Sequence, residues 1–334
     1  MTDKNELLVV AGADGFIGGS LVADLRRQGF TRIRAVGAKP FERWYQHFPD
    51  VENLRLDLKD RENCEAAAKG AYQIFMLAAD MGGMGFIETH RAECMLSVLI
   101  STHMLMAAQK CGVQGYFYSS SACVYNASKQ KEFDCPALKE EDAYPADAED
   151  GYGWEKLFSE RMCRHFREDY GLRTRVARYH NVYGPHGTWT GGREKAPAAI
   201  CRKVIEATLK GHTEIPVWGD GNQRRSFMYI DDCLKGTQMI MNSEVTEPLN
   251  LGSSEMVSVN QLIDIAESFA GKKFKRVYEL SAPKGVNGRN SDNTKIKQLL
   301  NWEPSIPLRV GLEKTYRWIY DQYVAREKGV AVLV

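Results

Sequence analysis

The chain has 334 residues, of which 44% are apolar and 26% charged, and its 44 basic and 43 acidic side chains give a net charge of +1. This length is enough for one large or two modest domains, and the composition is that of an ordinary globular protein. The sequence has no basic tail and no block of lysines and arginines. Charge therefore gives no reason to expect a nucleic acid or a membrane surface as a partner.

Two further features bear on the compartment. The first six residues are mostly polar, the apolar run at residues 7–10 is short, and no stretch approaches the roughly 20 apolar residues of a membrane span. None of the eight cysteines forms a Cys-x-x-Cys pair, which argues against a zinc ribbon or a redox dithiol. We therefore expect a cytoplasmic protein with reduced thiols, no bound metal and no membrane span.

Strand and helix signals alternate along the first half of the chain. Residues 6–11 form a continuous apolar run, as expected for a buried strand of a parallel sheet. Further strand signals occur at residues 31–36, 54–56, 73–78, 115–119 and 174–179. Helical periodicity fills the intervals, most clearly at residues 91–110 and 152–170. The alternation predicts an α/β protein with a doubly wound parallel sheet.

A glycine motif follows the first strand. Gly12, Gly15 and Gly18 lie between that strand and a helix, where the backbone must turn tightly and approach a pyrophosphate at the helix N-terminus. The motif predicts a dinucleotide-binding Rossmann domain over residues 1–180. After residue 180 the chain becomes rich in glycine, proline and tryptophan loops. We expect residues 181–334 to form a smaller α/β substrate-binding region, with segments around 226–250 returning to the first domain.

The choice of dinucleotide depends on the end of the second strand. An acidic residue usually stands there to hold the adenosine ribose, but this chain has Gly37. Lys39 or Arg43 could meet a 2′-phosphate, which would favour NADP, although both could equally be solvated surface charges. Asp57, at the end of the third strand, could hold the adenine. NAD remains the first expectation.

Catalytic residues are suggested by a tyrosine and a lysine four residues apart. Tyr152 and Lys156 lie on one face of a predicted helix. A lysine ammonium there would stabilise the phenolate and lower the pKa of the tyrosine, making it a usable general acid or base. Ser121 ends the run Ser119-Ser120-Ser121. It would hydrogen-bond the substrate hydroxyl on which Tyr152 acts. The alternative is a helix-start aromatic residue with a solvated lysine.

With Leu77-Ala78-Ala79 and the segment 225–232, these motifs resemble the extended short-chain dehydrogenase/reductase family, in its nucleotide-sugar-modifying branch. The resemblance covers nearly the whole chain. It implies transient oxidation of a sugar hydroxyl, usually at C4, by tightly held NAD. The cofactor contacts expected on this basis are Gly12, Gly15, Phe16, Ile17, Gly18, Asp57, Leu58, Leu77, Ala78, Ala79, Tyr152 and Lys156.

A cysteine and a lysine distinguish the chain within that branch. Dehydratases carry Asp-Glu just after the serine or threonine of the catalytic strand, whereas this chain has Ala122-Cys123. Segments 81–86, 119–123, 191–197 and 288–293 resemble the GDP-mannose 3,5-epimerases. That resemblance implies that Cys123 and Lys195 form an acid/base pair that exchanges protons at C5 and C3 of a 4-keto sugar. The alternatives are a core cysteine and a solvated loop lysine.

The resemblance also implies a set of substrate contacts. Asn181 matches the family's substrate-binding asparagine, and Arg225 and Arg289 fit diphosphate clamps because guanidinium groups match phosphate oxygens. Trp218 and Gln223 would form walls of the nucleotide pocket. The full set is Gly82, Gly83, Met84, Ser121, Cys123, Asn181, Lys195, Trp218, Gln223, Arg225 and Arg289.

The resemblance implies the conversion of GDP-D-mannose to GDP-L-galactose, and it leaves open GDP-L-gulose as a second product. The enzymatic alternative is a 4-epimerase or 5-epimerase of another GDP-sugar or nucleotide sugar. An alternative of another class is a non-catalytic dinucleotide sensor, because Rossmann folds are reused for regulation. By resemblance, the helices at 91–110 and 152–170 form the interface of a homodimer.

Overall fold

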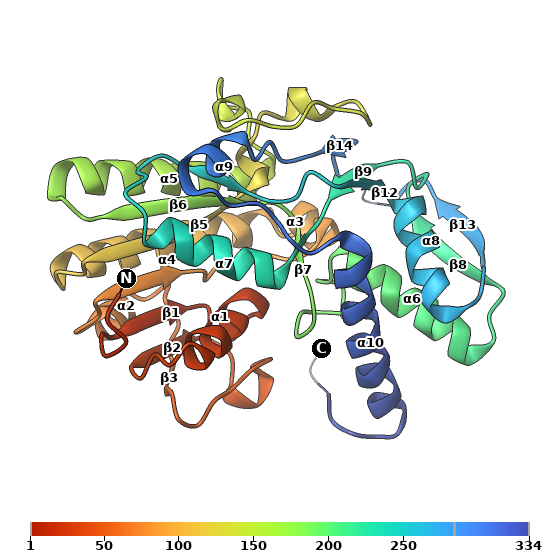
Figure 1. Cartoon of the computed structure of the whole chain (residues 1–334), viewed down its shortest axis with the longest axis horizontal. Helices are drawn as coiled ribbons and strands as arrows, with labels where there is room; N and C mark the ends of the chain where they lie inside the picture. The colour runs from red at the N-terminus through yellow and green to blue at the C-terminus, as the bar shows by residue number, and fades with distance from the viewer. Residues whose placement is uncertain (1, 283–284, 333–334) are drawn as a thin grey trace.

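A seven-stranded parallel sheet forms the centre of the larger part of the molecule (Figure 1). The computed structural model describes residues 2–282 and 285–332. The strand order is β11-β6-β5-β4-β1-β2-β3. The bounds are β1 Leu8–Ala11, β2 Ile33–Gly37, β3 Glu52–Arg55, β4 Gln73–Met76, β5 Gly115–Ser121, β6 Thr174–Tyr179 and β11 Leu249–Leu251. Every neighbouring pair in this sheet is parallel.

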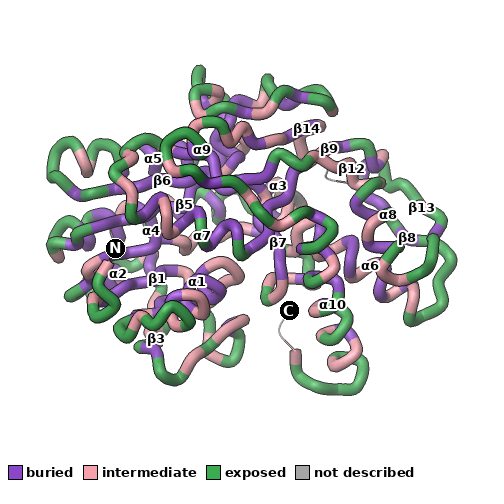
Figure 2. The backbone as a smooth tube through the Cα atoms, in the orientation of Figure 1, coloured by how far each residue is buried: buried purple, intermediate pink, exposed green. Residues whose placement is uncertain are grey.

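Helices cover both faces of the sheet, which confirms the predicted doubly wound α/β fold. One layer consists of α2 (Arg61–Ala68), α4 (Arg91–Lys110) and α5 (Asp150–Tyr170), and the other of α1 (Phe16–Arg27) and α7 (Ile230–Met241). Alternate side chains of β1 pack against the two helix layers, because successive side chains of a strand point to opposite faces of the sheet. Val9 belongs to the apolar cluster of Met104 on α4, and Val10 belongs to that of Leu21 on α1. Strand β1 is therefore buried from both sides, and the other strands of the sheet are also largely buried except β3, the edge strand, whose residues are exposed or half-buried (Figure 2).

A second group of elements lies beside this sheet (Figure 1). Its helices are α6 (Ala196–Lys210), α8 (Val259–Ala270) and α10 (Leu308–Glu327), which pack against one another. Three small sheets accompany them, β10-β7, β12-β9-β14 and β13-β8. Their bounds are β7 Val182–Tyr183, β8 Glu214–Trp218, β9 Arg224–Ser226, β10 Met228–Tyr229, β12 Met256–Ser258, β13 Lys275–Glu279 and β14 Gly288–Arg289. The remaining helices are α3 Met84–Thr89, α9 Thr294–Leu300 and the 3₁₀ turns η1 Phe41–Arg43, η2 Ala122–Val124, η3 Ala127–Gln130 and η4 Glu140–Ala143.

The observed boundaries lie close to the predicted ones. The helix expected at residues 91–110 and the strand expected at 174–179 have these bounds, whereas α5 begins two residues before the expected start at Tyr152. Strand β5 continues to Ser121, which places the serine run at its carboxyl end. Within residues 2–282 and 285–332, no helix is both long and apolar enough to cross a membrane. The same residues contain no group of metal-binding side chains, and all eight cysteines are unpaired.

A buried ion pair joins α5 to the sheet. Arg178 on β6 donates to Glu160 on α5 over 2.7 and 2.9 Å, and both side chains are at most 3% exposed. Ser120 on β5 donates to the same carboxylate over 2.5 Å. The pair therefore ties two strands and the helix together beneath the carboxyl end of β5.

Replacing one member of this pair is expected to be costly. Glu160→Ala leaves the Arg178 guanidinium buried without its carboxylate, so the free energy of unfolding should fall by about 3 to 5 kcal/mol. Urea denaturation followed by circular dichroism measures this loss. The double variant Glu160→Leu/Arg178→Met, which removes both charges, should lose clearly less. Equal losses in the two variants would show that packing, not the unpaired charge, sets the cost.

Candidate active site

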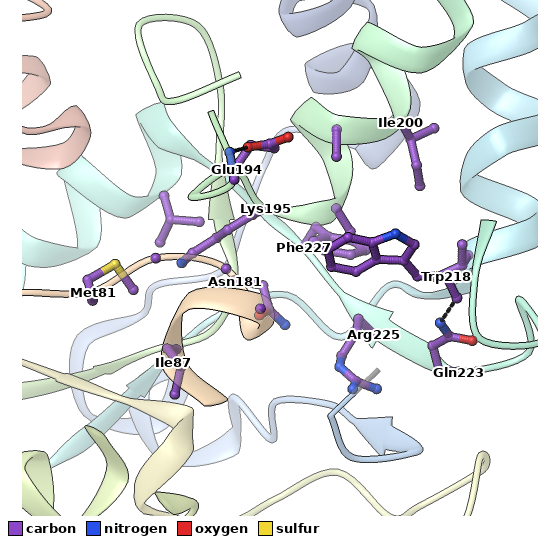
Figure 3. Close-up of a pocket in the computed structure, with 18 of the residues that line it drawn as sticks. Met81, Ile87, Asn181, Glu194, Lys195, Ile200, Trp218, Gln223, Arg225 and Phe227 are labelled. Carbon is purple, nitrogen blue, oxygen red and sulfur yellow. Dashed lines mark hydrogen bonds between the residues drawn. The ribbon is translucent and has the colours of Figure 1, made fainter. Parts of the chain in front are cut away.

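A cavity of about 750 Å³ opens where the carboxyl ends of β5 and β6 face the group containing α6, α8 and β9 (Figure 3). It brings together residues that are up to 272 positions apart in the sequence, from Ile17 to Arg289. The predicted site residues that line it are Ile17, Leu77, Ala79, Gly82, Gly83, Ser121, Cys123, Tyr152, Lys156, Asn181, Lys195, Trp218, Gln223, Arg225 and Arg289.

The glycine motif forms a tight cradle beside this cavity. Gly12 has φ +89°, and a Cβ there would lie 2.8 Å from the backbone nitrogen of Ala78. A Cβ on Gly18 would lie 2.1 Å from the carbonyl oxygen of Gly12. Both positions therefore exclude any side chain, and the strand, turn and first turn of α1 are arranged as a dinucleotide requires. The residues present fit that cofactor.

The other predicted cofactor residues surround the cradle. Phe16 begins α1 and lies next to Gly187. Leu58 is buried, whereas Asp57 is exposed after β3 and accepts a hydrogen bond from the amide of Lys59 over 3.0 Å. The backbone of β3 joins the end of β2 there, since the amide of Leu56 donates to the carbonyl oxygen of Gly37 over 2.9 Å.

Tyr152 and Lys156 lie side by side in the first turns of α5. The Lys156 ammonium is 5.6 Å from the centre of the Tyr152 ring and 4.8 Å from that of Tyr118. Burial, followed by the nearby Cys123 and Glu155, raises the pKa of Tyr152 well above its usual range, and a hydrogen bond with Ser121 opposes the rise. The predicted lowering of the tyrosine pKa is therefore wrong for this arrangement. The main physical reason is the burial of the phenol, and the Glu155 carboxylate, 3.8 Å from the Lys156 ammonium, adds to it.

Cys123 lies just after β5 in a polar setting. Its thiol is 3.6 Å from the guanidinium of Arg289, and its amide donates to the Ser121 hydroxyl over 3.2 Å. Arg289 is also paired with Glu149 and donates to Gln130 over 2.7 Å. Burial and the Glu149 carboxylate raise the pKa of the Cys123 thiol, whereas Arg289 and Ser121 act to lower it. The Cys123 thiol can therefore donate a proton, and the Arg289 guanidinium lies beside the thiolate that forms.

Lys195 comes from the loop before α6, and Figure 3 shows it among the residues around the cavity. Burial lowers the pKa of its ammonium, and the charge of a Cys123 thiolate opposes the shift. The loop is ordered by a close backbone contact. The Gly83 amide donates to the Arg193 carbonyl oxygen over 3.0 Å, and a Cβ on Gly83 would lie 2.5 Å from the Glu194 carbonyl oxygen. The glycines near residue 83 therefore let two distant segments meet at the cavity wall.

Two arginines approach each other in neighbouring strands. Arg225 on β9 and Arg289 on β14 are register partners. Burial and the Arg289 charge lower the pKa of Arg225 to about 10, so two guanidinium groups concentrate positive charge at one end of the cavity. Asn181 lies at a positive φ of 40° and donates to the Ser226 carbonyl oxygen over 3.0 Å. These groups could hold a diphosphate and a sugar hydroxyl.

Trp218 and Gln223 are further predicted contacts that line the cavity. Gln223 donates to the Trp218 carbonyl oxygen over 2.9 Å, as drawn in Figure 3. Its own amide oxygen is buried and has no hydrogen-bond partner among the described residues. Trp218 is 44% exposed and lies 3.5 Å from the Cβ position of Gly85. Met84 begins α3, but its side chain lies outside the described part of the structure.

Three residues of the site were missed at the sequence level. Glu149 pairs with Arg289, and Gln130 accepts from the same guanidinium. Gly153 lets α5 approach the end of β5, since a Cβ there would lie 2.3 Å from the Cys123 carbonyl oxygen. Glu149 carries a weak signal, an acid three residues before Tyr152. The roles of Gln130 and Gly153 depend on tertiary contacts and have no local signal.

The comparison with known families agrees with this geometry. Residues 8–252 match the family described as "NAD dependent epimerase/dehydratase family". The chain belongs to this family. The match includes the glycine cradle, the Tyr152–Lys156 pair and Cys123, and it confirms the family inferred from the sequence and the expectation of NAD.

Individual members of the NAD dependent epimerase/dehydratase family are also similar over most of the chain. A protein named GDP-mannose 3,5-epimerase from Arabidopsis thaliana is 43% identical over 98% of this chain and 85% of its own length. GDP-mannose 3,5-epimerase 1 from Oryza sativa subsp. japonica is 44% identical over 97% of this chain and 84% of its own length. Among solved structures, MoeE5 in complex with UDP-glucose and NAD is 27% identical, with a TM-score of 0.79 and coverage of 96% of this chain and 100% of its own.

The electrostatics of Cys123 lead to a test. Because the Glu149 carboxylate raises the pKa of the thiol, Glu149→Gln should lower that pKa. The rate of alkylation of Cys123 by iodoacetamide, followed by peptide mapping across a pH series, should then rise at lower pH than in the wild type. Glu141→Gln, an exposed change on η4, serves as the matched control and should leave the profile in place. An unchanged profile in Glu149→Gln would contradict the assigned influence.

Proposed function

We propose that the chain acts as a GDP-mannose 3,5-epimerase, converting GDP-D-mannose to GDP-L-galactose. The observation that carries this proposal is that Cys123 and Lys195 line one cavity together with Ser121, Tyr152 and Lys156. The two relatives of this name at 43% and 44% identity support it. A hydride site alone would interconvert hydroxyl and ketone, whereas the added thiol and amine provide groups that move protons on and off carbon.

The first step is oxidation at C4 of the sugar. Tyr152 takes the proton of the C4 hydroxyl, and Ser121 holds that hydroxyl by a hydrogen bond. Lys156 stabilises the phenolate form of Tyr152, which is the form that accepts this proton. NAD, when bound at the glycine cradle, supplies the hydride acceptor and later the hydride donor. Burial raises the pKa of Tyr152, so the proton that it takes stays on the phenol oxygen until the ketone is reduced at the end of the cycle.

The second step is proton exchange next to the ketone. Oxidation at C4 acidifies the hydrogens on C3 and C5, and inversion needs a base on one face of the carbon and an acid on the other. Cys123 and Lys195 come from different walls, one after β5 and the other before α6. Burial lowers the pKa of Lys195, which increases the fraction of neutral amine available as a base. Arg289 stabilises the Cys123 thiolate after it has given up its proton.

The nucleotide is held at the other end of the cavity. Arg225 and Arg289 provide positive charge for the diphosphate, and Trp218 and Gln223, which line the same cavity, would form the wall beside the base. The buried free oxygen of Gln223 could accept a hydrogen bond from an N–H group of guanine. Asn181, Gly82, Gly83 and the residues after them would contact the sugar.

The wider organisation is part of the same proposal. We place the boundary between the dinucleotide-binding and substrate-binding parts near residue 180, with α7 and β11 returning to the main sheet. Eight unpaired cysteines fit a reducing compartment such as the cytoplasm.

Helices α4 and α5 expose apolar side chains that a monomer has no reason to present, which supports a homodimer. These are Met95, Leu96, Leu99, Trp154 and Phe158, each between 39% and 50% exposed.

Incubation with GDP-mannose in D₂O tests the reaction. The wild type should introduce deuterium at C3 and C5 of the sugar, as read by NMR, because the thiol and amine that exchange protons with both carbons carry deuterium in D₂O. Cys123→Ala should reduce this exchange by about a hundredfold or more, since general acid/base groups contribute that much. Cys111→Ala, at the half-buried end of α4, is the matched control and should retain full exchange.

The other outcomes separate the alternatives. Inversion at C4 without deuterium at C3 or C5 would identify a 4-epimerase, because hydride transfer alone exchanges no proton with solvent. Deuterium at C5 alone would identify a 5-epimerase. Bound NAD without turnover of any nucleotide sugar would favour a dinucleotide sensor and overturn the proposal.

The dimer has its own test. Leu96→Glu combined with Phe158→Glu places charges on the exposed apolar faces of α4 and α5, so the variant should be monomeric in light scattering after gel filtration, whereas the wild type should be dimeric. Leu209→Glu, at an exposed apolar position of α6, is the control and should not change the mass. A monomeric wild type would contradict the proposed interface.

A further inference from the structure

The end of β2 has an unusual neighbour in the glycine cradle. Gly37, the last residue of β2, is buried and does not have a positive φ, so its backbone does not require glycine. The reason for a glycine there is space. A Cβ on Gly37 would lie 2.5 Å from Cβ, 2.6 Å from Cγ and 2.9 Å from Oδ1 of Asp14. The carboxyl group of Asp14 thus fills the volume that a side chain at position 37 would need.

Asp14 is held there by the backbone that follows β2. Its Oδ2 accepts hydrogen bonds from the amides of Ala38 and Lys39, both over 3.2 Å. Its Oδ1 accepts none from the described residues. The Lys39 ammonium donates to the Asp14 backbone carbonyl oxygen over 3.2 Å and lies 5.4 Å from the Tyr45 ring. One carboxylate oxygen is therefore fixed, and the other remains able to accept hydrogen bonds at the edge of the cradle.

This arrangement replaces the missing acid of the second strand. In dinucleotide-binding sheets the acid at the end of that strand binds the 2′-hydroxyl of the adenosine ribose. Here the carboxylate reaches the same place from the glycine loop, and the strand residue is reduced to glycine to make room for it. We propose that Asp14 selects NAD over NADP in this chain by accepting hydrogen bonds from the adenosine ribose hydroxyls and repelling a 2′-phosphate. The proposal rests on the glycine cradle being the dinucleotide site.

Cofactor binding measures this directly, without turnover. The purified protein is stripped of bound dinucleotide and titrated with NAD and with NADP by calorimetry. The wild type should bind NAD more tightly. Asp14→Asn keeps the size of the side chain and removes its charge, so the ratio of NAD to NADP affinity should fall about tenfold or more, as expected for hydrogen bonds to a charged group. Glu42→Gln removes a nearby exposed charge on η1 and should leave the ratio unchanged.

A relocation of the acid provides the second measurement. Gly37→Asp alone should lower the melting temperature, because the new side chain would overlap the Asp14 carboxyl group. Asp14→Gly combined with Gly37→Asp places the acid on the strand and clears that space, so both the melting temperature and the preference for NAD should recover. Asp14→Gly alone should lose the preference that the double variant recovers; if the single variant kept the preference for NAD, Asp14 would serve only as a backbone anchor.

The failures are distinguishable. If Asp14→Asn weakened NAD and NADP binding equally, or changed neither, Asp14 would be a structural residue and the inference would be overturned. If the wild type bound neither dinucleotide, the cradle itself would be wrongly assigned and the proposed function would fail with it.

Discussion

The attachment of α5 to the carboxyl end of β5 is the constraint on which the site depends. Three contacts fix it: the buried Glu160–Arg178 pair, the bond from the Glu149 amide to the Cys123 carbonyl oxygen at 2.8 Å, and the close approach allowed by Gly153. Together they place the residues of the helix, Tyr152 and Lys156, against Ser121 and Cys123 of the strand end. Groups for hydride chemistry and for proton exchange therefore share one rigid frame.

The second wall of the cavity is distinguished by buried positive charges. Lys195, Arg225 and Arg289 come from elements outside the main sheet, and each carries a positive charge into a buried setting. Burial is unfavourable for such charges unless anions accompany them. Glu149 supplies one such anion to Arg289, and a diphosphate would supply another. The unfavourable burial of these positive charges would thus be offset by the negative charges of a nucleotide-sugar diphosphate.

Much of this could be predicted from the sequence. The alternation of strands and helices, the glycine spacing and the Tyr152–Lys156 pair are features of short stretches of sequence, so they could be recognised without the structure. The fold class, the family and NAD, which were predicted from them, are confirmed. The roles of Glu149 and Gln130 were not foreseen, because they arise from segments more than a hundred residues away from Arg289. The predicted direction of the Tyr152 pKa shift was wrong chiefly because tertiary packing buries the phenol, which raises its pKa, and secondarily because Cys123 and Glu155 lie nearby.

The contact between Gly83 and the segment 193–194 has a consequence beyond the site itself. The two backbones touch so closely that no side chain fits between them, although the segments are separated by α3, α4, α5 and the strands among them. A larger residue at position 83 can be accommodated only if the loop before Lys195 moves away, and with it the lysine. Over evolutionary time, the sequence before α3 and the loop before α6 can therefore diverge only as a coupled pair.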